Sequence, residues 1–143
     1  MIVKNILASK RGEVVTIEPT ADVTTAVKLL AERRIGAVVI LGADHRIVGI
    51  LSERDIVRAL AERGAAALDE PVSGAMTRKV STAHERETVA SIMERMTAGK
   101  FRHVPVVDQG RLTGVVSIGD VVKHRLQEME RDSAAMRDYI LTA

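Results

Sequence analysis

Two short stretches of the chain place a serine and an aspartate three residues apart, behind a glycine and two apolar residues. The first is GILSERDIV, from Gly49 to Val57, and the second is GVVSIGDVV, from Gly114 to Val122. A serine and a carboxylate at this spacing form a capping box, in which each side chain bonds the backbone N–H of the other residue where a helix begins. The same pair also suits a ligand, because a helix start presents free backbone amides to an anion and a carboxylate accepts hydrogen bonds from ribose hydroxyls.

We call Ser52 with Asp55 the first corner and Ser117 with Asp120 the second corner. The glycine that stands three residues before each serine favours a ligand, because glycine weakens a strand and is kept there where something approaches the backbone closely. Capping and ligand binding are compatible. We therefore expect each corner to cap its helix and also to contact the phosphate and the sugar of a ligand.

The sequence around the two corners is also an internal repeat. Apolar and threonine positions between Val14 and Ile35 match positions between Val80 and Phe101, each 66 residues later, and the two corners match each other 65 residues apart. A repeat of this length indicates one structural unit used twice. A unit of about 60 residues without a disulfide has a marginal core, so we expect the two units to pack together through their sheets.

Each repeat predicts the same order of elements, β-α-β-β-α. Apolar residues spaced at i, i+3, i+4 and i+7 predict helices, and short valine-rich runs predict strands. For the first repeat we expect a strand at 14–17, a helix from Val23, strands at 37–41 and 47–51, and a helix at 52–63 that Gly64 ends. For the second repeat we expect a strand near Val80, a helix at 87–98, strands at 104–107 and 112–116, and a helix from Ser117.

A related lead-in precedes each repeat, at 3–7 and at 72–76, and the last helix continues into a tail. The predicted fold is therefore α/β, with duplicated β-α-β-β-α units packed as a pseudo-two-fold pair and a C-terminal helical extension. We place the first unit at 1–66, the second at 67–128 and the tail at 129–143. The tail carries apolar residues at the spacing of a coiled-coil seam, which predicts a contact with a second subunit or with its own chain: Val122, Leu126, Met129, Met136 and Ile140, interrupted by Ser133.

Composition excludes several classes of function. The chain has no cysteine, which rules out disulfides, zinc–thiolate sites and a thiol nucleophile, and it has one Phe, one Tyr and no Trp to stack on bases. The net charge of +2 comes from mixed acidic and basic residues, so we expect no nucleic-acid partner. No apolar run reaches the roughly 20 residues of a membrane span, and we expect a cytoplasmic protein. His45, His84 and His124 show no metal-ligand spacing, and we predict that they lie on the surface.

The duplicated unit with its Gly-h-h-Ser-x-x-Asp motif (h, apolar) resembles a tandem pair of CBS (cystathionine β-synthase) domains, also called a Bateman module, from about Val3 to Leu126. The segment FRHVPVVD, from Phe101 to Asp108, strengthens the resemblance. It implies a stand-alone, bacterial-type regulatory module that acts in signal transduction, binds an adenine nucleotide in the cleft between its two units and forms a homodimer. The implied ligand is AMP, ADP, ATP or a related adenosyl molecule such as NAD, with Mg²⁺ accompanying ATP and no covalent cofactor.

The resemblance also implies a role for individual residues. The aspartate of each corner would hold the ribose, the serine would touch the phosphate, and strand residues would contact the adenine. Arg102 and His103 would neutralise phosphate, and since the first repeat has Gly36 and Ala37 there, we expect one better phosphate site or a shared one. The expected ligand-binding residues are Thr16, Ile17, Val39, Ser52, Asp55, Thr82, Ala83, Arg102, His103, Pro105, Ser117 and Asp120.

A second hypothesis is a ligand-free dimerisation scaffold that acts on a partner protein. In that case the two corners would only cap their helices. We do not expect an enzyme, because the chain has no Ser-His-acid pattern at a recognisable spacing, no Gly-x-Ser-x-Gly elbow and no Walker loop.

Overall fold

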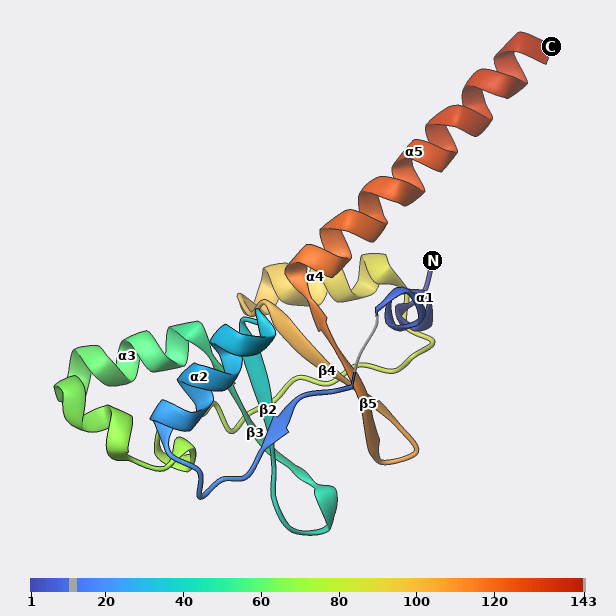
Figure 1. The fold of residues 1–143 in the computed structure, drawn as a ribbon. Helices are drawn as coiled ribbons and strands as arrows, with labels where there is room; N and C mark the ends of the chain where they lie inside the picture. Colours follow the sequence, from blue (N-terminus) through green and yellow to red (C-terminus); the bar gives the residue numbers. More distant parts are fainter. Residues whose placement is uncertain (11–12, 143) are drawn as a thin grey trace. The chain divides into compact units, whose positions relative to one another are not determined.

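The computed structural model describes residues 1–10 and 13–142, and the chain packs as two compact units. Unit 1 combines the N-terminal segment with the chain from Thr82 onward, and unit 2 comprises Glu13–Ser81 (Figure 1). These packing units differ from the sequence segments 1–66 and 67–128. The reason is that each lead-in packs on the strands of the other repeat: the N-terminal one belongs to unit 1, and the one at 72–76 belongs to unit 2.

Unit 2 contains the first β-α-β-β-α set, which confirms the predicted order. Its strand order is β1-β2-β3, with β1 parallel to β2 and β2 antiparallel to β3. The elements are β1 (Thr16–Ile17), α2 (Val23–Arg33), β2 (Ala37–Leu41), η1 (Ala43–His45), β3 (Ile47–Ser52), α3 (Glu53–Arg63), η2 (Gly64–Asp69) and η3 (Val72–Gly74). The stripe that predicted α2 is buried in the core of this unit, which consists of Val23, Ala26, Leu30, Val38, Ile40, Leu51, Ile56 and Val72.

Local chemistry sets the ends of the unit 2 helices. Asp22 caps α2 by accepting the Thr25 amide at 2.8 Å, and Gly64 ends α3 with a positive φ of 65°. A side chain at Gly64 would be strained in this conformation, which explains why the helix stops there.

Unit 1 contains α1 (Val3–Ser9), α4 (Val89–Gly99), β4 (His103–Asp108), β5 (Arg111–Ser117) and α5 (Ile118–Thr142). The strands β4 and β5 pair antiparallel. The core of unit 1 unites the lead-in helix with the second repeat and consists of Val3, Ile6, Ala83, Val89, Ile92, Met96, Val104, Val106, Val116 and Val121.

The strand predicted near Val80 is wrong. Only Ala83 pairs with β4 there, through an isolated parallel bridge to Val106 in which its amide donates to the Pro105 carbonyl at 2.9 Å. In unit 2 the corresponding strand also pairs Thr16 with Val39. Pro105 stands where the first repeat has Val39, and because proline has no N–H to donate, that pairing has no counterpart at Thr82.

The last helix, α5, is 25 residues long and extends beyond the other elements of unit 1 (Figure 1). Its buried residues are Val121 and His124, in its first turns. Ile118 is half-buried against the core of unit 1. The large apolar residues from Val122 onward are exposed: Val122, Leu126, Met129, Met136, Tyr139, Ile140 and Leu141. In the part of the chain that the structure describes, no helix combines the length and apolar character that a membrane crossing requires.

Candidate functional site

The glycine before each corner, Gly49 or Gly114, leaves space that a side chain of a lead-in fills. A Cβ at Gly114 would overlap Leu7, with Leu7 Cδ1 at 3.3 Å, and a Cβ at Gly49 would meet the Met76 side chain and the Thr77 carbonyl oxygen, the latter at 3.0 Å. Leu7 and Met76 occupy the same place in the two lead-ins. The close approach that each glycine predicts therefore exists, but the approaching group is protein, so the glycines themselves do not argue for a ligand.

The first corner, at the start of α3, is closed by hydrogen bonds. The Ser52 amide and hydroxyl donate to Asp55 Oδ2 at 2.9 and 3.1 Å, and the Asp55 amide donates back to Ser52 Oγ at 3.4 Å. The Thr77 hydroxyl donates to Asp55 Oδ1 at 2.9 Å, with an Arg58 nitrogen at 3.5 Å from the same oxygen. Asp55 is 5% exposed, and both of its oxygens accept protein hydrogen bonds.

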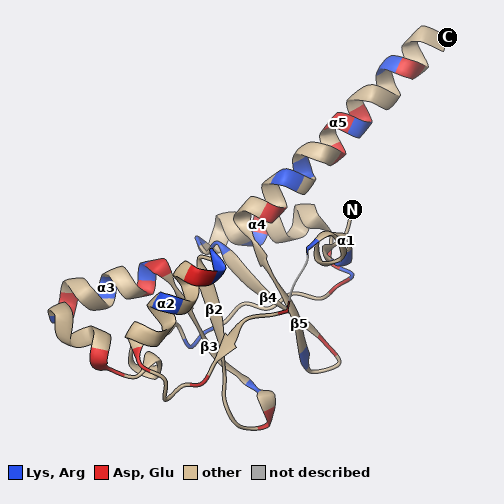
Figure 2. Cartoon of the chain, viewed as in Figure 1, with Lys and Arg blue, Asp and Glu red and all other residues tan. Residues whose placement is uncertain are grey.

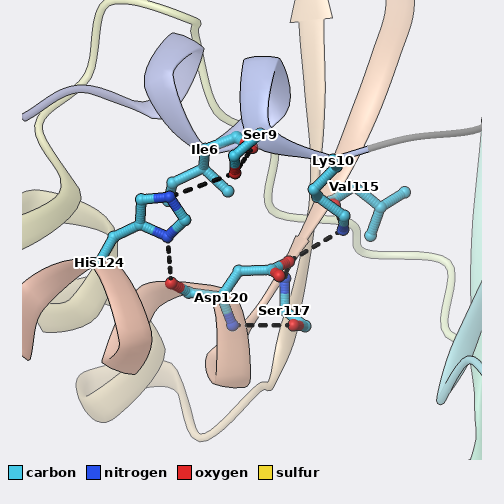
Figure 3. Close-up of polar contacts among 7 residues, drawn as sticks. All are labelled: Ile6, Ser9, Lys10, Val115, Ser117, Asp120 and His124. Atoms are coloured by element: carbon cyan, nitrogen blue, oxygen red, sulfur yellow. Dashed lines mark hydrogen bonds and ion pairs between the residues drawn. The ribbon is translucent and has the colours of Figure 1, made fainter. Parts of the chain in front are cut away.

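The second corner, at the start of α5, forms the same capping box with a different neighbour (Figure 3). The Ser117 amide donates to Asp120 Oδ2 at 2.9 Å, and the Asp120 amide donates to Ser117 Oγ at 3.1 Å. Lys10, from the N-terminal lead-in, donates its Nζ to the same Oδ2 at 2.9 Å and to the Val115 carbonyl at 2.6 Å. The capping prediction is thus confirmed at both corners.

The Asp120 carboxylate is ionised and partly exposed to solvent. Burial opposes its ionisation, but the Ser117 amide and the Lys10 ammonium outweigh burial and hold the pKa of Asp120 below its usual value. The Asp120 side chain is 22% exposed and that of Lys10 is 42% exposed. Hydrogen bonds from the described residues reach only Oδ2 of Asp120. Oδ1 is therefore available to accept a hydrogen bond from a ligand, close to the Lys10 ammonium.

The basic pair of the second repeat lies beside the second corner. In the β4–β5 register His103 is directly opposite Ser117, and the Arg102 carbonyl accepts the Ile118 amide at 2.8 Å. Directly opposite residues of an antiparallel pair project from the same face of the sheet. In unit 2 the residue opposite Ser52 is Ala37, so the first corner has no such basic residue beside it on β2. Arg102 is exposed and His103 is half-buried.

The strand residues expected to contact adenine divide between the two units. In unit 2, Thr16 is exposed and Ile17 is half-buried on β1, while their neighbour Val39 on β2 is fully buried. In unit 1, Thr82 is exposed, while Ala83 and Pro105 are buried. Thr16, Ile17 and Val39 lie on the sheet that leads into the first corner. Pro105 lies on β4 beside the second corner, and of Thr82 and Ala83 only Ala83 pairs with that strand.

Two functional candidates were absent from the sequence prediction. Lys10 reaches Asp120, and Thr77 reaches Asp55, each from the lead-in that packs on that unit. The sequence contained an indication of a basic residue at this place. When the match between the two lead-ins is extended by three residues, Lys10 aligns with Lys79, which follows Arg78. The repeat alone does not indicate which corner a lead-in reaches.

The prediction that His124 lies on the surface is wrong, since it is 6% exposed beneath α1. Its Nδ1 donates to the Asp120 carbonyl at 2.9 Å, because a carbonyl oxygen only accepts, and its Nε2 lies 3.3 Å from Ser9 Oγ (Figure 3). His124 therefore ties α1 to the second corner. His45 and His84 are exposed as predicted. Within residues 1–10 and 13–142, no cluster of three or more His, Asp or Glu side chains could hold a metal ion.

Comparison with known proteins identifies this duplicated unit. The family described as CBS domain matches residues 3–62 and 72–127 of the chain. The chain belongs to the CBS domain family. It is similar to the crystal structure of a CBS-domain containing protein, ATU1752, from Agrobacterium tumefaciens, with 48% identity and a TM-score of 0.83 over 87% of this chain and 92% of that one.

Two further CBS structures carry adenosyl ligands. The CBS domain protein PAE2072 from Pyrobaculum aerophilum, complexed with AMP, is 32% identical with a TM-score of 0.75 over 84% of this chain and 89% of that one. The CBS domain pair of protein MJ0100, in complex with 5′-methylthioadenosine and S-adenosyl-L-methionine, is 29% identical with a TM-score of 0.79 over 90% and 98%. The chain spans between 39% and 73% of the first curated relatives that it matches.

Proposed function

We propose that the chain is a non-enzymatic regulatory module that binds an adenosyl ligand and acts in signal transduction in the cytoplasm. The observation that carries this proposal is the arrangement at the second corner. Asp120 Oδ1 is available as an acceptor beside Lys10, and His103, next to Arg102, lies directly opposite Ser117 in the β4–β5 pair. Support comes from the two CBS structures that hold AMP, 5′-methylthioadenosine or S-adenosyl-L-methionine.

Each group at the second corner has a distinct task in this proposal. Asp120 Oδ1 accepts hydrogen bonds from the ribose hydroxyls, and the Ser117 hydroxyl bonds the phosphate. Lys10, with Arg102 and His103, supplies the positive charge that a phosphate requires. The exposed Thr82 and the backbone of Ala83 and Pro105 border the adenine.

The first corner takes the equivalent tasks with Thr16, Ile17, Val39, Ser52 and Asp55. Because its carboxylate oxygens already accept protein donors, ligand binding there has to displace Thr77 or Arg58. We therefore propose that the second corner binds more tightly. AMP, ADP, ATP and NAD are the candidate ligands, with Mg²⁺ bound through the phosphates when the ligand is ATP.

Isothermal titration calorimetry with AMP, ADP, ATP, NAD and 5′-methylthioadenosine tests the proposal. Asp120→Ala should weaken binding of whichever adenosyl ligand gives heat by roughly tenfold or more, because a charge-assisted hydrogen bond to the sugar is lost. Lys10→Met should weaken AMP more than 5′-methylthioadenosine, which has no phosphate. The matched control is Asp138→Ala on exposed helix surface. No heat with any ligand, or equal effects of Asp120→Ala and Asp138→Ala, would contradict the proposal.

The alternative function is a ligand-free scaffold, and the closed first corner is the observation that favours it. If both corners only cap their helices, Asp55→Ala and Asp120→Ala lower the stability of the protein, and neither the wild type nor the variants bind an adenosyl ligand. We also propose that the chain forms a homodimer that binds an effector protein in trans. The exposed apolar residues of α5 support this, because an exposed apolar patch of this kind marks a protein–protein interaction site.

A further inference from the structure

Five of the exposed apolar residues of α5, with Ser133 among them, form one continuous seam. They recur alternately after four and three residues, which is the spacing of positions a and d in a coiled coil. Position a is Leu126, Ser133 and Ile140, and position d is Val122, Met129 and Met136. The exposed fractions of the five apolar members lie between 41% for Val122 and 65% for Ile140. We call these six residues the α5 seam.

The α5 seam is separate from the face that α5 packs on its own unit. Val121 and His124 are buried in unit 1, and Glu128 pairs with the N-terminal ammonium at 2.9 Å. Residues 121, 124 and 128 follow one another at positions c and f, on the side of the helix that faces away from the seam. All residues from Met129 to Tyr139 are exposed, so within the described chain the seam has no cover along most of its length.

Charges that flank the seam select a direction for a second copy. Figure 2 shows both signs alternating along α5. Position g holds Arg125, Asp132 and Tyr139, and position e holds Lys123, Glu130 and Arg137. In a parallel, in-register pair each g residue meets the e residue five positions later on the partner. This brings Arg125 to Glu130 and Asp132 to Arg137, which are opposite charges in every case.

An antiparallel pair brings like charges together. In an antiparallel pair centred on residue 131, each a residue packs beside a d residue of the other copy, so that Leu126 lies beside Met136. In this arrangement each g position lies next to a g position of the other copy, and each e position next to an e position. Asp132 would face Asp132 and Glu130 would face Glu130, with Lys123 near Arg137. Like charges at these flanking positions destabilise a coiled coil and set its orientation. Arg125 already pairs with Glu128 at 2.7 Å, and in the parallel pair it lies between two acidic groups.

We propose that the α5 seam binds a second copy of this chain as a parallel, in-register two-stranded coiled coil from Val122 to Ile140. The inference rests on the proposed homodimer and adds its contact face and direction. Ser133 is the polar member of the seam, and a polar residue at an a position specifies register at a cost in stability. The association is therefore reversible rather than permanent.

Disulfide cross-linking tests the direction directly, because the chain has no cysteine of its own. Met129→Cys and Met136→Cys are made separately, and the matched control is Arg131→Cys on the opposite side of α5. After mild oxidation of the full chain, non-reducing electrophoresis should show each seam variant as a covalent dimer, formed roughly tenfold faster than in the control. In an antiparallel pair neither variant cross-links alone, whereas Leu126→Cys mixed with Met136→Cys does. That result would overturn the proposal.

Charge reversal gives a second measurement that does not depend on cysteine geometry. Asp132→Arg places like charges opposite Arg137 twice in the parallel dimer and should weaken association by roughly tenfold in sedimentation equilibrium. Adding Arg137→Asp restores the opposite charges and should recover the wild-type dissociation constant. Both residues are exposed in the single copy, and circular dichroism checks that the fold is unchanged. Failure of the double variant to recover would also count against the parallel pair.

The outcomes separate this inference from the proposals on which it rests. If the wild type stays monomeric at all protein concentrations, the homodimer and the coiled coil both fail. If it dimerises and Met129→Glu with Met136→Glu leaves the dimer intact, the homodimer stands but uses another surface, such as the exposed Val57 and Leu60 of α3, and the coiled coil fails. Nucleotide titration of the same variants reports on the ligand independently.

Discussion

Replacing Gly114 by alanine tests why a glycine precedes the second corner. The structure indicates that the missing Cβ makes room for Leu7 of the lead-in, whose Cδ1 and Cγ would lie 3.3 and 3.4 Å from it and whose Cδ2 would overlap it. We therefore expect Gly114→Ala to destabilise unit 1 without any ligand present. A glycine kept for a ligand would instead leave the stability of the free protein unchanged.

The magnitude follows from two opposing terms. Forcing an extra methyl group into a filled space costs about 1–3 kcal/mol. Alanine recovers about 0.5–1 kcal/mol relative to glycine, because the unfolded chain loses less conformational freedom on folding. The difference between the middles of these two ranges gives an expected net loss in the free energy of unfolding of about 1 kcal/mol. The matched control is Gly74→Ala, where a Cβ meets nothing within 4 Å, and no loss is expected.

Urea unfolding followed by far-UV circular dichroism measures this difference, since the chain has no tryptophan to report by fluorescence. Leu7→Ala removes the overlapping side chain, so the combined variant should lose about 1 kcal/mol less than the sum of the two single changes. If Gly114→Ala unfolds at the same urea concentration as the wild type, or if the two changes simply add, the assignment of this glycine to the lead-in is refuted.

Three other predictions concern the corners and the end of α3. Asp55→Ala should lower the free energy of unfolding by about 2–3 kcal/mol, because a buried acceptor of several donors is lost, against about 1 kcal/mol for Asp120→Ala; equal losses in urea would contradict this. Because the folded pKa of Asp120 is lowered, its contribution is complete above the unfolded pKa of about 3.9 and is lost as the pH falls through the folded value. The stability advantage of the wild type over Asp120→Asn should therefore shrink below about pH 4, and a constant difference would refute the Lys10 contact. Gly64→Ala should cost about 1–3 kcal/mol in thermal or urea unfolding, and a neutral result would contradict the positive φ.

The order of elements follows from the sequence because each element has a strong local signal. The apolar stripe from Val23 lies on α2, the valine-rich run at 37–41 forms β2, and Gly64 ends α3. The capping box is equally local, since Ser52 and Asp55 are three residues apart and need no distant partner. Predictions of this kind depend on contacts within one turn or one strand, and the structure confirms them.

Predictions failed, or could not be made, where the deciding contact joins distant parts of the chain. The partner of each lead-in depends on packing between Leu7 and Gly114, about which their spacing says nothing. His124 is polar and lies on a largely exposed helix, and it is buried where α1, with Ser9, and α4 pack on that helix. Pro105 was recognised as part of a strand, but its missing N–H removes a pairing on the neighbouring segment instead of in its own strand.

The duplication explains why the two corners share a framework yet differ in their electrostatics. The backbone of both is determined by the same requirements: a glycine that admits a lead-in side chain, a serine that caps, and an aspartate that completes the box. The polar residue that the lead-in brings to the carboxylate is not subject to these requirements. At Asp55 it is Thr77, which adds no charge, and at Asp120 it is Lys10, which adds a positive one. A single exchange in each lead-in, Thr77→Lys or Lys10→Thr, is therefore expected to change the charge beside one corner while the fold of both units is retained.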